Sequence, residues 1–398
     1  MANDLTNIMP KILARGLSAL REVVIMPRLV NGDYSSEAKK KGSTIDVPRS
    51  VAVATRAVAP SNVPPSSVDH DPELVQITLD NWQQNDPIHL QDDELVQVDK
   101  DAHYLPLQVS EAIKGLANDV NLDIMGNYKG VYAAVGTAGT TPFATTAAGA
   151  IDAKGALNKM LCPRGQRRLI LDTDAEANAL ALSVFSDLEK TGDKNVKIEG
   201  EIGRKYGFDF FYEDHVLTHT AGSMSGTASG GAGKATLNGA LSAGATTLAL
   251  DDATSLTGTL VEGDLISFAG LTNNGKSGTP HFVVTSTFTA VDPDMTGVTF
   301  DPPIPAGGVA DNTVVTLEDD HVVNMAFQRD AIAFATRPLI TSTVGMALGS
   351  QIMSMQDPKT GLVLRLEVSR QHKQVAWEFD ILWGSKLIRP EFACRILG

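Results

Sequence analysis

The sequence predicts an α+β fold that is interrupted by a small all-β insertion. Helical periodicity and strand alternation both occur on either side of residues 222–318. This stretch itself contains short β-type segments separated by Gly, Pro, Asn and Asp, and it shows no helical period. With 398 residues the chain is long enough for two or three domains, each with its own core.

The composition is that of a globular protein, with 43% hydrophobic and 20% charged residues. No apolar run approaches the roughly 20 residues that span a bilayer, and residues 1–7 lack the basic and apolar segments of a signal peptide. We therefore expect a soluble protein that is made in a cytoplasm and has no membrane partner. The two cysteines, Cys162 and Cys394, are expected to be reduced thiols.

The net charge of −14 argues against a dedicated DNA-binding protein. The charge is uneven, because residues 1–60 hold nine Lys/Arg and five Asp/Glu, whereas residues 61–101 hold one Lys and ten Asp/Glu. A basic arm next to an acidic stretch favours contacts between copies of the chain or with a charged partner. A solvated surface without a partner is the alternative.

The first element is an amphipathic helix over residues 8–24, with Asn7 as a possible cap and Pro10 in the first turn. The apolar stripe and the basic residues on the other faces are Ile8, Ile12, Leu13, Leu17, Leu20 and Val24 against Lys11, Arg15 and Arg21.

Residues 32–80 predict a long extended hairpin with a Pro/Ser-rich tip at 60–67. Its strands are Thr44–Val47 and Val51–Thr55 on the way out and Glu73–Asp80 on the return. Because an isolated hairpin is marginally stable in water, we expect this arm to rest on another molecule. The alternative is a flap folded back on its own domain.

A long helix follows, with Val109, Ile113, Leu116, Val120 and Ile124 on one face. We expect Ser110 to cap it and Gly126 to end it. Residues 136–149, rich in Gly, Ala and Thr, are expected to form a loop.

Residues 150–220 predict a small α/β layer with strands at Arg168–Leu171 and Phe208–Tyr212. The sequence Thr173–Glu176 is typical of a capping box, so a helix is expected from there to about Lys190. Its predicted buried face is Ala177, Leu180, Val184 and Leu188.

Beyond the insertion, apolar structure resumes at Val322–Phe327 and Ala331–Phe334. Apolar and charged residues then alternate in Leu362–Val368 and Val375–Ile381, which predicts strands of a half-buried antiparallel sheet.

Residues Gly270–Ser277 match the phosphate-loop pattern letter for letter, with Lys276 and Ser277 in the phosphate- and magnesium-binding positions. A working loop follows a strand and opens a helix. Here Gly278, Thr279 and Pro280 follow, and then a β-branched strand, Phe282–Val284. We therefore interpret the match as a tight turn, and nucleotide binding through Lys276 and Ser277 remains the alternative function.

Four metal-capable side chains, Glu213, Asp214, His215 and His219, lie within seven positions. They stand where a strand runs into a Gly-rich loop, so their convergence is not expected. No nucleophile, paired carboxylates or histidine relay is evident. We predict no catalytic, cofactor-binding or metal-binding residues, and hence no enzyme and no cofactor.

Three stretches resemble the coat proteins of short-tailed bacteriophages, which have the HK97-like (Johnson) capsid fold with an inserted I-domain. Gly263–Gly270 resembles a strand of that inserted domain. Asn324–Ala331 with Thr336–Leu339 resembles the segment that re-enters the host domain, and Ile381–Glu391 is similar to the last strand and turn of the family.

The resemblance implies a division into five parts. They are an N-terminal arm helix at 1–30, an extended loop at 31–80, a peripheral domain with a spine helix at 81–148 and 346–398, an axial domain at 149–221 and 319–345, and the inserted β-barrel domain at 222–318.

The same resemblance implies a structural major capsid protein that assembles with itself, as hexamers and pentamers, into an icosahedral shell around double-stranded DNA. Its implied partners are a scaffolding protein, a portal protein and the packaged DNA, bound non-specifically. The implied location is the virion, after assembly in the host bacterial cytoplasm. A soluble ligand-binding module built on the β insertion is a further alternative.

Overall fold

The structure is a computed structural model, and it divides into two compact units that we describe separately. Unit 1 comprises Met1–Pro27, Gly32–Ala117 and Ala333–Ile388, and unit 2 comprises Arg28–Asn31, Asn118–Ile332 and Arg389–Gly398. The residues that the structure describes are 8–23, 25–33, 40–49, 55, 60, 73–91, 107–186, 202–226, 235–252, 256–271, 280–291, 294–340, 350–357, 360–371 and 374–398.

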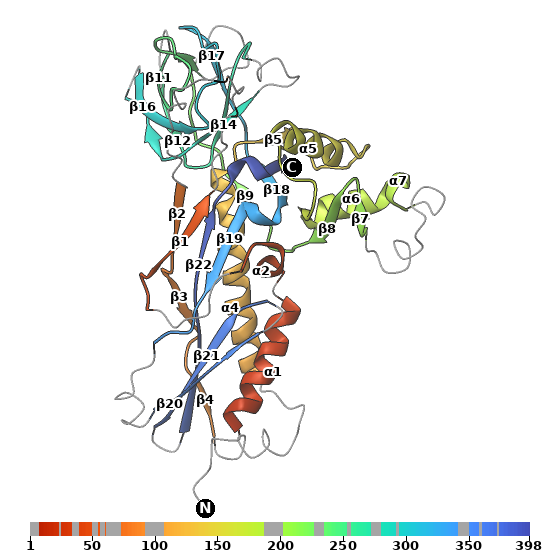
Figure 1. The fold of residues 1–398 in the computed structure, drawn as a ribbon, viewed down its shortest axis with the longest axis vertical. Coiled ribbons are helices and arrows are strands. Elements are labelled where there is room, and N and C mark those ends of the chain that lie inside the picture. Colours follow the sequence, from red (N-terminus) through yellow and green to blue (C-terminus); the bar gives the residue numbers. More distant parts are fainter. Residues whose placement is uncertain are drawn as a thin grey trace, which may run out of the picture. The chain divides into compact units, whose positions relative to one another are not determined.

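Unit 1 is built on a six-stranded antiparallel sheet (Figure 1). Its longest strand, β22, lies between β21 and β19, and both β3 and β4 also pair with it. The strands are β3 (Asn81–Gln84), β4 (Ile88–Leu90), β19 (Ile332–Thr336), β20 (Ser350–Gln356), β21 (Val363–Gln371) and β22 (Gln374–Leu387). The alternation of Leu364, Leu366 and Val368 with polar residues places the apolar side chains of β21 on one face.

Helix α1 (Ile8–Val23) packs against β20 and β21, as its amphipathic pattern predicts. Ile12, Leu13, Leu17 and Leu20 are buried. Gly16 lies so close to the long helix α4 (Leu107–Gly126) that an added Cβ would be 2.7 Å from the Cδ1 atom of Ile113. The glycine that weakens the isolated helix therefore allows close helix packing.

Helix α4 has the predicted buried face. The predicted cap is wrong, because Ser110 lies within the helix, which begins at Leu107. The chain continues from Gly126 into the short 3-10 helix η1 (Asn127–Gly130) in unit 2. A short helix, α2 (Met26–Leu29), follows α1 along the chain. None of the described helices combines the length and hydrophobicity of a membrane span.

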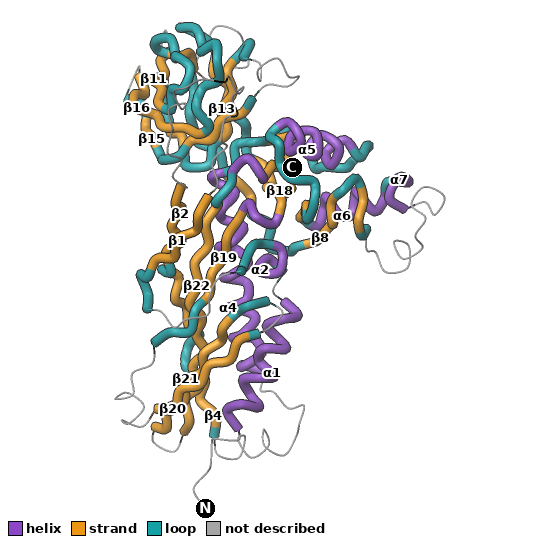
Figure 2. The backbone as a smooth tube through the Cα atoms, viewed as in Figure 1, coloured by secondary structure: helices purple, strands orange, loops and turns teal. Residues whose placement is uncertain are grey.

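Unit 2 contains a seven-stranded mixed sheet in the order β5–β23–β18–β6–β8–β7, with β9 paired to β18. The strands are β5 (Ala134–Gly136), β6 (Arg167–Leu171), β7 (Arg204–Lys205), β8 (Phe208–Tyr212), β9 (Thr218–His219), β18 (His321–Gln328) and β23 (Ala393–Leu397). Figure 2 shows helices beside these strands, and their apolar side chains share one core with the sheet.

The helices of unit 2 differ from the prediction. Helix α5 (Ala148–Lys159) was expected to begin as loop, because its Gly and Ala residues give a weak apolar stripe. Helix α6 (Thr173–Ala181) is capped by the Asp172 carboxylate, which accepts from the Asp174 N–H, so Thr173 is not the cap.

The helix also does not run to Lys190. It ends at Ala181, and after Leu182 the short helix α7 (Ser183–Ser186) follows; residues 187–190 lie outside the described chain. The predicted face is wrong within α6 itself, where Ala175 and Ala179 are buried and Ala177 is exposed. After the break, Phe185 is buried and Val184 is exposed.

The insertion forms a closed barrel in the order β10–β11–β16–β14–β13–β17, in which β17 pairs back to β10. Its strands are β10 (Ala235–Leu237), β11 (Thr247–Asp251), β13 (Leu265–Phe268), β14 (His281–Val284), β16 (Asp294–Asp301) and β17 (Val314–Leu317). A two-stranded ladder of β12 (Thr259–Leu260) and β15 (Phe288–Thr289) accompanies it. Closure leaves the barrel without a free edge, which protects it from edge-to-edge aggregation.

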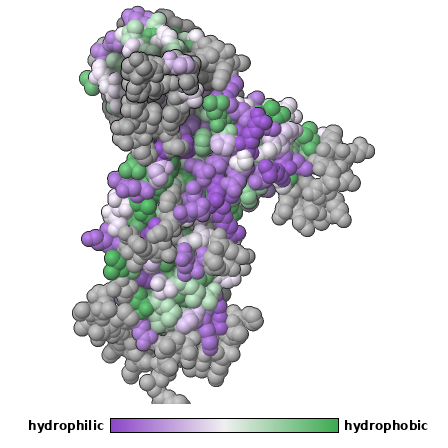
Figure 3. Space-filling model, viewed as in Figure 1, coloured by the Kyte–Doolittle hydropathy of each residue, from purple (hydrophilic) through white to green (hydrophobic). Residues whose placement is uncertain are grey.

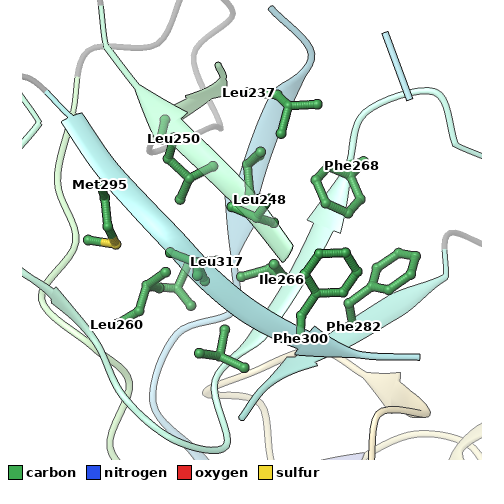
Figure 4. Close-up of a cluster of buried hydrophobic side chains, with 14 of the residues drawn as sticks. Leu237, Leu248, Leu250, Leu260, Ile266, Phe268, Phe282, Met295, Phe300 and Leu317 are labelled. Atoms are coloured by element: carbon green, nitrogen blue, oxygen red, sulfur yellow. The ribbon is translucent and has the colours of Figure 1, made fainter. Parts of the chain in front are cut away.

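The barrel has its own apolar core, drawn in Figure 4. Phe268, Phe282 and Phe300 pack edge to face, with ring centroids 5.2–6.4 Å apart. Such aromatic pairs add to the free energy gained by burying the rings. The observed fold is α+β with an inserted barrel, as the fold class predicted.

We predict that Phe282→Ala destabilises the barrel by about 3–5 kcal/mol, because it removes a buried ring from this cluster. Val291→Ala, at a barrel residue that is 79% exposed, should change stability by less than about 0.5 kcal/mol. Urea unfolding followed by hydrogen exchange of barrel peptides measures both. Equal effects of the two substitutions would contradict the assigned core.

Candidate assembly surfaces and the buried junction

The basic residues of the N-terminal region do not all fall on one described surface. Lys11 is exposed and Arg15 is partly exposed, one turn apart on the face of α1 that points away from the sheet. Arg28 is exposed in α2. It is the first residue of the segment Arg28–Asn31, which belongs to unit 2. The side chain of Arg21 lies outside the described part. Lys11 and Arg15 are therefore the pair that the structure brings together.

The base of the predicted arm is a two-stranded ladder, β1 (Thr44–Arg49) with β2 (Glu73–Thr78). Its inner face carries Ile45, Val47 and Val75, which pack with Ile77 on the core of unit 1. Gly384 of β22 makes this approach possible, because an added Cβ there would lie 2.3 Å from the carbonyl oxygen of Thr78. The expectation that the arm rests on another molecule is therefore wrong for its base, which packs on its own unit.

The outer face of the ladder carries Leu74 opposite Pro48, among polar residues. On this face the amide of Gln76 donates to the Asp46 carboxylate over 2.9 Å. Arg49 and Glu73, 3.8 Å apart, end the ladder on the inner side. Leu74 is 60% exposed on the outer face. The tip at 60–67 and most of Val51–Thr55 lie outside the described residues. An exposed leucine on the arm is a contact that a second copy can cover.

The phosphate-loop match lies in the connection between two barrel strands. Strand β13 precedes it and β14 follows it, paired antiparallel with Leu265 opposite Val283. Residues 272–279, with Lys276 and Ser277, lie outside the described chain. After this gap the chain forms a strand, and a phosphate loop requires a helix at that position. The described residues after the match thus lack the helix that a phosphate loop requires.

Of the four metal-capable side chains near residue 215, the two histidines have different partners. His215 lies 3.4 Å from Glu213, which also accepts from the Asn121 amide over 3.3 Å. His219 instead points into the junction between barrel and sheet. Within the described ranges, no group of three or more His, Cys, Asp and Glu side chains is arranged to hold a metal ion. Both cysteines are free and buried.

The junction contains a buried hydrogen-bond chain that no sequence pattern indicated. The Tyr128 hydroxyl lies 3.1 Å from Nδ1 of His219, and Nε2 of His219 lies 2.9 Å from the Asp264 carboxylate. Since the carboxylate can only accept, Nε2 of His219 carries a proton and donates it to Asp264. This chain of hydrogen bonds thus links η1, β9 and the loop before β13.

Asp264 is completely buried and holds the beginning of the insertion. Its carboxylate accepts from the backbone N–H of Gly222 over 3.1 and 3.2 Å and from that of Val261 over 2.8 Å. Gly222 has to be glycine, because an added Cβ would lie 2.2 Å from the carbonyl oxygen of Thr259. The Asp264 carboxylate therefore holds together two backbone segments, at Gly222 and at Val261, that pass close to each other.

Arg395 supplies a buried positive charge on the other side of the junction. It is completely buried, its Nη1 donates to the carbonyl oxygen of Gly263 over 2.8 Å, and its guanidinium lies 5.0 Å from the ring centroid of Tyr128. Burial lowers the pKa of Arg395 to about 9, and the charges of Tyr128 and Asp264 oppose this shift. Burial raises the pKa of Tyr128. The buried cation and carboxylate compensate each other.

A cavity of about 670 Å³ lies between α5 and the barrel in unit 2. Its walls present polar and apolar surface in similar amounts, and they include Phe282, Met160 and Tyr132 together with Asp152 and Lys159 of α5. Over α5 and α6 the face shown in Figure 3 is largely hydrophilic, with isolated hydrophobic residues among the polar ones. This cavity is where the alternative ligand-binding function would place a ligand.

Comparisons with solved structures found phage and virus-like capsids. A capsid structure of the cyanophage P-SCSP1u is 10% identical, covers 94% of this chain and 88% of its own, and has a TM-score of 0.46. The mature capsid of bacteriophage PhiM1 is 10% identical over 93% and 86%, with a TM-score of 0.43. A virus-like particle from Pyrococcus furiosus is 9% identical over 97% and 98%, also with a TM-score of 0.43. No family model and no curated protein matches the chain.

We predict that Gly222→Ala destabilises unit 2 by about 1–3 kcal/mol, since the new methyl group would meet the backbone at Thr259. Gly165→Ala is the matched control, because nothing lies within 4 Å of its added Cβ. Thermal unfolding of both variants tests this. A Gly222→Ala protein as stable as the control would contradict the close approach of the two backbone segments.

Proposed function

We propose that this chain is a major capsid protein that assembles with itself into a closed icosahedral shell around double-stranded DNA. The order of parts along the chain carries the proposal. An amphipathic helix on a sheet, a two-stranded arm, a long helix, a mixed sheet and a barrel between β9 and β18 follow one another as the sequence resemblance implies.

The division into five parts belongs to this proposal. Residues 1–30 are the arm helix, 31–80 the extended loop, 81–148 and 346–398 the peripheral domain, 149–221 and 319–345 the axial domain, and 222–318 the inserted barrel. In this arrangement the barrel adds a domain to each subunit without interrupting the sheet of unit 2, because β9 and β18 pair directly beside it.

The proposed partners are further copies of the chain, a scaffolding protein, a portal protein and the packaged DNA. Lys11 and Arg15, on the solvent-facing side of α1, are the residues that we assign to the acidic partner. Contacts of Lys and Arg with phosphates are independent of sequence and weaken as the salt concentration rises. The outer face of the arm, with Leu74, is assigned to contacts between copies. The proposed location is the virion, after assembly in the host cytoplasm.

We predict that Arg15→Glu impairs assembly or recruitment of the scaffolding protein, because it reverses the charge on the outer face of α1. Lys114→Glu is the matched control on α4, where Lys114 pairs with Glu111 over 2.9 Å and is also exposed. Sedimentation velocity separates subunits from shells. Assembly of Arg15→Glu at the level of the control would contradict the assignment of this face.

We predict that Leu74→Asp leaves the folded subunit within about 0.5 kcal/mol of wild type, because the side chain is exposed, and yet reduces assembly. Val291→Asp, at the more exposed residue of the barrel, is the control. Light scattering during assembly gives the yield for each. Unchanged shell formation by Leu74→Asp would remove this face of the arm from the interface.

The alternative, a nucleotide-binding protein, has its own test. Calorimetric titration with ATP and magnesium should give no binding at millimolar nucleotide for the wild-type protein. Binding that disappears in Lys276→Ala would favour the alternative over the capsid proposal.

A further inference from the structure

His321 lies where the chain returns from the barrel to the host sheet. It is the first residue of β18, and its backbone pairs with His219, at the end of β9. The two imidazole centroids are 5.2 Å apart, and His321 is 2% exposed. The two strands that connect the barrel to the host sheet therefore meet at a buried pair of histidines.

The hydrogen bonds of His321 define where it can take up a proton. Its Nδ1 lies 2.8 Å from the carbonyl oxygen of Asp319. Because a carbonyl only accepts, Nδ1 carries the proton of the neutral ring and Nε2 carries the lone pair. Within the described chain, Nε2 is buried and has no hydrogen-bond partner. Protonation would create a buried N–H without an acceptor, which is unfavourable.

The charges around this ring also disfavour protonation. Arg395 faces it from β23 and His219 faces it from β9. Glu318 acts in the opposite direction, but its carboxylate already lies 3.5 Å from His281. Burial first, and then Arg395 and His219, lower the pKa of His321, and the Asp319 carbonyl and Glu318 offset only part of this.

The other acidic groups of the junction are engaged with the segment that leads into the insertion, which we call the neck (residues 217–222). The Asp320 carboxylate accepts from the Ala221 N–H over 2.7 Å, and Asp264 accepts from Gly222 and from His219. The Val323 N–H donates to the Leu217 carbonyl oxygen over 2.9 Å. The neck is thus held by bonds to β18 and to Asp264, on both sides of His321.

We infer that His321 makes the attachment of the inserted barrel sensitive to acid. Uptake of one proton from solvent at its Nε2 atom weakens the pairing of β9 with β18 and releases the neck from the host sheet. The barrel itself stays folded, because its core is separate from the junction. The inference concerns the single subunit and holds whether or not the chain forms shells.

The pH range follows from the direction of the shift. A histidine with a lowered folded pKa contributes its full stability above the ordinary value of about 6.5. That contribution decreases as the pH falls below about 6.5 toward the folded value, because the opened state then binds the proton more tightly. Each pH unit in this range can favour opening by up to about tenfold.

Hydrogen exchange with mass spectrometry at pH 7.5 and 5.0, corrected for intrinsic exchange rates, tests the inference on the full chain. In the wild type the neck should lose at least about tenfold in protection at pH 5.0, while β11 and β16 keep theirs. His321→Asn, whose amide can still donate to the Asp319 carbonyl, should show no such loss. His215→Asn, at a solvent-exposed histidine of the same unit, should behave as wild type.

Constant protection of the wild-type neck, or an equal loss in His321→Asn, would overturn the inference. Should His321→Asn fold poorly, the pKa of His321 in the wild-type protein can be measured by NMR of the labelled imidazole. A value above 6.5 would also overturn it.

Discussion

The junction of barrel and host sheet depends on a carboxylate and a guanidinium that are both removed from water. Isolated buried charges are very costly, so Asp264 and Arg395 require each other and a set of hydrogen bonds. Asp264 obtains its bonds from Gly222, Val261 and His219, and Arg395 donates to the Gly263 carbonyl. The backbone has to come close to satisfy these groups, which explains the glycine at position 222.

Within unit 2, the folding of the barrel and its attachment to the sheet depend on different interactions. The barrel is stabilised by its own apolar core around the three phenylalanine rings. The sheet and its helices share a second core. A small third cluster, Leu265 and Val283 of the barrel with Leu397 of the sheet, is the apolar part of the contact between them. The orientation of the barrel on the sheet therefore depends mainly on polar bonds, which are directional, and its folding depends on apolar burial, which is not.

Local patterns predicted most of the elements. Alternation identified β2 and β21, and the apolar stripes identified α1 and α4. Short β-type runs between turn residues identified the barrel as all-β. Helix α5 escaped because its buried face is Ala150, Ala153 and Leu157, which is a weak signal among glycines. The junction could not be predicted, since Tyr128 and His219 are 91 residues apart and Arg395 is 132 residues from Gly263. The residues of the junction belong to no local sequence motif, and only the fold brings them together. The phosphate-loop match at Lys276 and Ser277, by contrast, is a clear motif but falls between two strands.

In the proposed function the subunit assembles with further copies through α1 and the arm, and the barrel is an attached domain. Cryo-electron microscopy of the expressed protein, alone and with its scaffolding partner, tests this most directly. We expect closed icosahedral shells in which every subunit carries a barrel. A protein that stays monomeric under both conditions would contradict the account.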